Sequence, residues 1–95
     1  MFQRISNKEI HGLAFTVFVP NIHQIRYTED RHIALIEIEG GTSKDGQVDW
    51  LIYRETLRGW EPPFEKDEFS TEKRAEVLSR ISESLTILEM PHKLA

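Results

Sequence analysis

Apolar residues divide the first part of the chain into four segments that are typical of β-strands. Residues 13–19 (LAFTVFV) form a continuous apolar run that ends before Pro20, and residues 22–28 alternate apolar with polar side chains. Residues 32–39 are rich in isoleucine, and residues 48–57 follow a loop that contains three glycines. An Asp-Gly pair in this loop favours a hairpin. The pattern therefore predicts four strands, the last two joined directly.

The apolar spacing changes to three and four residues after Ser70, which indicates one face of a helix. Ser70 or Thr71 can cap the start of this helix, and Glu72 suits the positive end of its dipole. Pro91 ends it. The apolar stripe consists of Val77, Leu78, Ile81, Leu85 and Leu88.

This order of elements predicts a single α+β domain over residues 1–95. Local hairpins favour a four-stranded, mainly antiparallel sheet, with one long C-terminal helix packed on one face in a two-layer arrangement. A chain of 95 residues can bury a single core without disulfides.

The register of residues 32–39 against residues 48–57 follows from their faces, because opposed residues of an antiparallel pair share a face. Pairing even positions with even positions joins two apolar rows, which we predict to lie under the helix, with Trp50 in the core. These rows are His32, Ala34, Ile36 and Ile38, and Val48, Trp50, Ile52 and Arg54.

The odd face is divided into an apolar patch and an acidic cluster. The patch comprises Ile33, Leu35, Leu51 and Tyr53. It can be covered by residues 58–69 or 1–12, form a homodimer interface, or bind another protein, and of these we favour cover by the chain itself. The acidic cluster comprises Glu37, Glu39 and Asp49. These side chains are either solvated, or contact a basic partner, or share a proton or a weakly held divalent cation.

Residues 58–69 (RGWEPPFEKDEF) form the most unusual segment. Gly59 frees the backbone, and the paired prolines favour an extended, polyproline-like crossover. We predict that the first half is structural, with Trp60 closing the core, and that the acids meet a basic partner. The structural anchors are Trp60, Pro62, Pro63 and Phe64, and the partner-binding acids are Glu61, Glu65, Asp67 and Glu68.

Composition excludes several classes of function. The net charge of −4 argues against nucleic-acid binding, and the absence of cysteine excludes disulfides and thiolate zinc sites and fits a cytoplasmic location. No apolar run suits a signal peptide or membrane span. Residues 40–44 lack P-loop spacing, and no serine occupies a nucleophile elbow. The histidines have no ligand-like spacing. We therefore expect no metal, no cofactor and no enzymatic activity.

One further pattern combines a strand, a proline-containing segment, an acidic spacer and a helix. The strand is Trp50-Leu51-Ile52-Tyr53, the segment is Trp60-Glu61-Pro62-Pro63-Phe64, and the helix runs through Ile81, Leu85 and Leu88. Over residues 33–88 this pattern resembles small bacterial immunity proteins of polymorphic-toxin systems. The resemblance implies a compact domain that binds and blocks a toxin, and it identifies no contact residue.

The leading hypothesis is thus a non-enzymatic protein-binding module that inhibits a toxin. The alternatives are a homodimeric structural or regulatory protein that self-associates through Leu35, Leu51 and Tyr53, and a weak divalent-metal binder that uses Glu37, Glu39 and Asp49.

Overall fold

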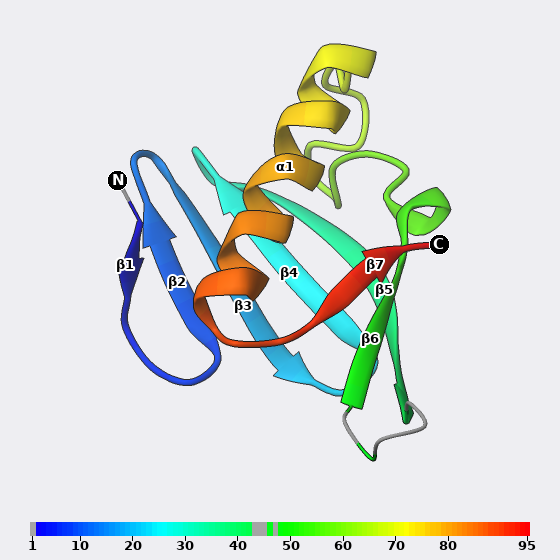
Figure 1. The fold of residues 1–95 in the computed structure, drawn as a ribbon. Coiled ribbons are helices and arrows are strands. Elements are labelled where there is room, and N and C mark those ends of the chain that lie inside the picture. Colours follow the sequence, from blue (N-terminus) through cyan, green and yellow to red (C-terminus); the bar gives the residue numbers. More distant parts are fainter. Residues whose placement is uncertain (1, 43–45, 47) are drawn as a thin grey trace.

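The computed structural model describes residues 2–42, 46 and 48–95, which form one curled sheet and one long helix (Figure 1). The expected turn at Asp45-Gly46 lies largely outside the described residues. The elements are β1 (Gln3–Arg4), β2 (Glu9–Gly12), β3 (Phe15–Asn21), β4 (Gln24–Glu29), β5 (His32–Thr42), β6 (Val48–Tyr53), the 3₁₀ helix η1 (Arg54–Thr56), α1 (Thr71–Ile87) and β7 (His92–Leu94).

The strands lie in the sheet in chain order, from β1 to β7. Neighbours from β1 to β6 are antiparallel, whereas β7 returns after α1 and pairs with β6 in parallel. The sheet curls as a half-barrel around α1, which lies across its concave face (Figure 1). The predicted α+β class and the helix on one face are therefore confirmed.

The predicted number of strands is wrong, because the sheet formed by the described residues has seven in place of four. The prediction missed β1, β2 and β7, which are only two, four and three residues long. In β2 only Ile10 is fully buried, so its sequence carries almost no hydrophobic period. The strand expected at 13–19 also begins later, since Leu13 is exposed and Ala14 adopts a left-handed turn conformation with φ of 68°.

The predicted register between β5 and β6 is confirmed. Ile38 lies opposite Ile52, and Gly40 lies opposite Trp50, so even positions pair with even positions. Ala34, Ile36, Ile38 and Ile52 are all buried in the core. Trp50 is only half-buried and packs against the margin of that core. Its ring lies over Gly40, where an added Cβ would be 3.3 Å from the tryptophan ring.

The helix fills the concave side of the sheet with the predicted stripe. Val77, Ile81, Leu85 and Leu88 are buried, and Leu78 is partly buried against the same cluster. Ser70 caps α1, because its hydroxyl accepts a hydrogen bond of 3.0 Å from the Lys73 amide. No helix among the described residues has both the length and the apolar character needed to span a bilayer.

Candidate functional site

Residues 58–69 continue past the end of β6 along the free edge of β5. The Glu61 amide donates a 2.7 Å hydrogen bond to the Ile33 carbonyl, so this segment takes over the edge that β6 leaves. The Trp60 side chain is 7% exposed and closes the core beside Tyr27 and Phe69, with ring centroids 6.4 and 5.0 Å away. Residues 58–69 are therefore attached to the sheet by both backbone and aromatic contacts.

The segment turns sharply after Trp60 and is not the expected polyproline-like crossover. The Phe64 amide donates to the Glu61 carbonyl, and the Asp67 amide donates to the Phe64 carbonyl, both at 3.0 Å. A polyproline helix makes no such internal hydrogen bonds. The peptide bond between Pro62 and Pro63 is cis. Both prolines are exposed at the tip of this segment.

His32, the first residue of β5, joins the sheet to this segment. Its ring stacks on Phe64 at a centroid distance of 4.1 Å and meets Trp60 edge-on at 5.1 Å. Its Nε2 lies 2.7 Å from the Asp67 carboxylate, and its Nδ1 lies 2.7 Å from the Asp30 carbonyl. The hydrogen bond to Asp67, followed by that to Asp30, raises the pKa of His32 above its ordinary value.

The acids predicted in residues 61–68 all lie in the stretch that follows Trp60, here called the acidic segment (residues 61–68): Glu61, Glu65, Asp67 and Glu68. All of them are exposed. Asp67 and Glu68 line an open hollow together with His32 and Trp60. The lining of this hollow also includes Asp30, Lys66 and Lys73. Within the described residues, no ion pair joins Glu61, Glu65 or Glu68 to a cation.

The other three predicted acids have different neighbours. Glu37 lines a second hollow with Glu61, Leu35 and Arg58. Glu39 accepts a hydrogen bond from the Tyr53 hydroxyl, which raises the pKa of that tyrosine. Asp49 lies opposite Gly41 and lines a third hollow, near the end of α1.

The metal-binding alternative finds no site in this arrangement. Among residues 2–42, 46 and 48–95, no three histidine, aspartate or glutamate side chains are placed to hold a metal ion. Glu37, Glu39 and Asp49 do not form such a group of three. Along the β5–β6 ladder Glu37 lies opposite Tyr53, Glu39 opposite Leu51 and Asp49 opposite Gly41, so no two of these acids face each other directly.

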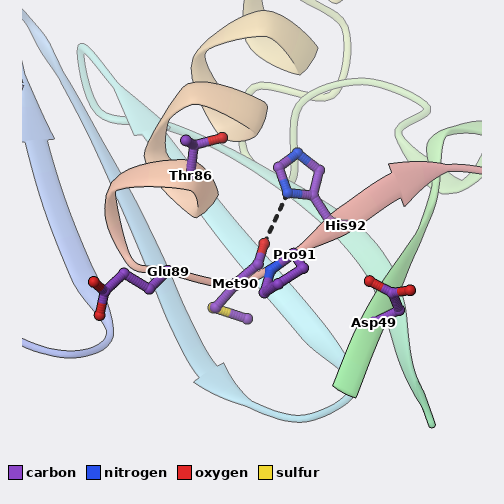
Figure 2. Close-up of a pocket in the computed structure, with 6 residues that line it drawn as sticks. All are labelled: Asp49, Thr86, Glu89, Met90, Pro91 and His92. Atoms are coloured by element: carbon purple, nitrogen blue, oxygen red, sulfur yellow. Dashed lines mark hydrogen bonds between the residues drawn. The ribbon is translucent and has the colours of Figure 1, made fainter. Parts of the chain in front are cut away.

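The third hollow lies where α1 leads into β7, and Figure 2 shows its lining: Asp49, Thr86, Glu89, Met90, Pro91 and His92. His92 Nδ1 lies 2.9 Å from the Met90 carbonyl, and its Nε2 lies 2.7 Å from the Ser82 hydroxyl. No pattern in the sequence predicts this serine–histidine contact. Because it joins a helical residue to the first residue of β7, it fastens the last strand to α1.

A polar network between β4 and α1 also went unpredicted. Glu29 accepts hydrogen bonds from Tyr27 at 2.5 Å, Lys73 at 2.8 Å and Arg80 at 3.0 Å. Burial alone would raise the pKa of Glu29, but its hydrogen bonds with Lys73 and Tyr27 and the two cations outweigh burial and lower it. Burial and the contact with Glu29 raise the pKa of Tyr27. The sequence does contain two signals for this network. Tyr27 and Glu29 are two residues apart on β4, and Lys73, Glu76 and Arg80 follow one another at spacings of three and four on α1.

The apolar patch on the odd face is half-buried at each of its members, Ile33, Leu35, Leu51 and Tyr53. Residues 58–69 lie beside two members of this patch, Ile33 and Leu35. The Glu61 amide bonds the Ile33 carbonyl, and Leu35 lines the same hollow as Arg58 and Glu61.

The sequence itself matches a known family. The family model described as Immunity protein 74 matches residues 22–91. The chain belongs to the Immunity protein 74 family. This membership confirms the resemblance to immunity proteins of toxin systems that residues 33–88 suggested. No curated protein and no solved structure compared with the chain gives a match.

The Immunity protein 74 match begins after β3 and includes β4, β5, β6, α1 and the acidic segment. It therefore contains His32, Trp60 and every acid predicted to meet a partner. The features that position the acidic segment all lie within the Immunity protein 74 part of the chain, whereas β1, β2 and β3 extend the sheet outside it.

Proposed function

We propose that this protein neutralises a cognate toxin by binding it directly, as a non-enzymatic stoichiometric inhibitor. Membership of the Immunity protein 74 family supports this function. We choose the acidic segment as the toxin-binding surface because it is exposed and is held on a buried aromatic anchor, Trp60. The toxin would be covered at its own functional surface, so inhibition would result from occlusion.

The charge of the acidic segment supports a basic partner. Glu61, Glu65 and Glu68 are exposed and make no ion pair within the described residues, so their charge is not neutralised there. Carboxylates in this state attract a basic surface over a distance and increase the rate of association. Glu37 shares a hollow with Glu61, and we include it in the same binding surface. We place Glu39 and Asp49 at its margin.

The rigidity of the segment supports tight binding. Trp60 is buried, the Glu61 amide bonds to β5, and two turn hydrogen bonds define the path to Asp67. A loop that is already ordered loses less conformational entropy on association than a free one. Phe64 and the exposed prolines supply apolar area beside the acids.

The test is co-expression and co-purification with the protein encoded immediately upstream of the gene, which the proposal expects to be a toxin. The Glu65→Lys/Glu68→Lys variant should lose at least about tenfold in affinity, because two attractive contacts become repulsive. Glu55→Lys/Glu83→Lys makes the same charge change at exposed positions elsewhere and should bind like the natural sequence.

Growth of cells that produce the toxin supplies the functional measurement. We expect the natural chain and the control variant to restore growth, and the Glu65→Lys/Glu68→Lys variant to fail. If the neighbouring protein forms no complex and the chain restores no growth, the proposed function is wrong. If both charge variants bind equally well, the function stands but the acidic segment is not the surface.

A further inference from the structure

The contacts of His32 indicate its protonation state. Nδ1 and Nε2 each lie 2.7 Å from an acceptor, namely the Asp30 carbonyl and the Asp67 carboxylate. A neutral imidazole has one N–H group and can donate to only one of them. Both hydrogen bonds exist together only in the imidazolium form. The geometry therefore fits a positively charged His32.

The charged groups around His32 come from three elements. Glu29 and Asp30 lie at the end of β4, Lys73 extends from α1, and Lys66, Asp67 and Glu68 come from the acidic segment. Lys73 is engaged by Glu29 and Glu76, at 2.8 and 2.7 Å. Asp67 is the carboxylate that contacts the ring. The His32 side chain is 20% exposed, so solvent can exchange its proton.

His32 also connects parts of the chain that are far apart in sequence. Asp67 is 35 residues away, and the stacked Phe64 lies in the same turn as Asp67. Loss of the proton leaves a lone pair on one ring nitrogen, facing either a carbonyl oxygen or a carboxylate. One of the two hydrogen bonds is then replaced by repulsion, so the ring is held less firmly and the contact between β5 and the turn that contains Phe64 and Asp67 is weakened.

We infer that His32 is a positioning residue whose imidazolium form holds the acidic segment in its binding conformation, so that protonation of this one side chain regulates association with the toxin. The inference rests on the proposed function. Full affinity is expected below the ordinary histidine pKa of about 6.5, and affinity declines as pH rises through the higher pKa of the folded protein.

The first experiment uses the free protein, so its result does not depend on any toxin. Proton NMR of the histidine rings across pH 5–9 should give His32 a midpoint above the ordinary histidine value of about 6.5. Asp67→Asn should lower the His32 midpoint and leave that of His23 unchanged. Trp60 fluorescence, measured in a Trp50→Phe background, should follow the same transition as His32. A His32 midpoint at the ordinary histidine value, or one unaffected by Asp67→Asn, overturns the inference.

The second experiment measures affinity for the toxin against pH. For the natural chain the affinity should fall by up to about tenfold per pH unit above the His32 midpoint, as expected for one linked proton. His32→Gln should bind more weakly at pH 6 and lose this pH dependence, whereas His23→Gln should retain it. If the affinity of His32→Gln depends on pH as strongly as that of the natural chain, the proposed regulation by His32 is wrong, because the titrating group then lies elsewhere.

The two experiments separate the inference from the proposed function. A complete absence of toxin binding at every pH contradicts the proposed function, while the NMR titration still decides whether His32 holds the segment. Thermal unfolding of His32→Gln at pH 6 serves as the folding control. If this variant does not fold, Asp67→Asn takes its place in the affinity series and should shift the pH dependence to lower pH.

Discussion

Lys73, in the first turn of α1, bonds Glu29 at the end of β4, with 2.8 Å between Nζ and Oε2. Arg80 reaches the other oxygen of the same carboxylate at 3.0 Å. Glu29→Gln removes the charge that these cations share, so we expect a loss of about 1–3 kcal/mol in the free energy of unfolding. Urea denaturation measures it. Glu76→Gln, at a more exposed position on α1, should cost under about 0.5 kcal/mol. Equal losses would contradict this role for Glu29.

The same carboxylate predicts how stability changes in acid. Burial opposes ionisation of Glu29, but the hydrogen bonds from Lys73 and Tyr27 and the charge of Arg80 prevail, so its pKa is lower than that of an ordinary glutamate. A lowered pKa in the folded state means that the stabilisation is complete above the unfolded value and is lost as pH falls through the folded value. Unfolding free energies from pH 6 to pH 2.5 should therefore fall more steeply for the natural chain than for Glu29→Gln. Parallel curves would assign acid unfolding to other groups.

Gly12 lies against the ring of Phe15, and an added Cβ would be 2.1 Å from two of its ring atoms. Phe15 is buried and stacks on Tyr27, so it can move only by disturbing the core. Gly12→Ala should destabilise the protein by about 1–3 kcal/mol, measured by thermal or urea unfolding. Gly41→Ala is the matched control, because its nearest contact would be an ordinary 3.5 Å. A Gly12→Ala protein as stable as Gly41→Ala would show that the Phe15 ring adapts without cost.

The two tryptophans should differ in their contribution to stability. Trp60 is 7% exposed, whereas Trp50 is half-buried at the margin of the core. Trp60→Ala should cost about 3–5 kcal/mol, and Trp50→Ala clearly less. Urea denaturation of both variants gives the comparison. The reverse order would mean that Trp50, and not Trp60, closes the core.

The elements that depend on local spacing could be predicted from the sequence. The stripe through Ile81 and Leu85 defines α1, and the isoleucine row of β5 determines its register against β6. Short strands carry too few buried side chains to show a period, which is why β1, β2 and β7 were missed. Pro20 was expected to end a strand but lies within β3, where pairing with β4 is irregular between Phe18 and Asn21.

The candidate site could be predicted only in part. Exposure of Glu65 and Glu68 agrees with the charged run of residues 65–68, and exposure of Glu61 agrees with its own charge. The contact between His32 and Asp67 depends on two consecutive turns after Trp60, and no spacing in the sequence encodes the path of those turns. The Glu29 network likewise joins residues that are distant in the sequence, because Lys73 lies 44 positions and Arg80 lies 51 positions from Glu29.

The parallel pairing of β7 with β6 has a consequence for the order of folding. Strands β1 to β6 form a meander of neighbours, so each of their contacts closes a short loop, whereas pairing of Ile52 with Leu94 closes a loop that includes all of α1. Long loops form late because their closure costs more entropy. We expect β7 to dock after the folding transition state. Leu94→Ala should therefore accelerate unfolding in stopped-flow experiments and leave the folding rate almost unchanged.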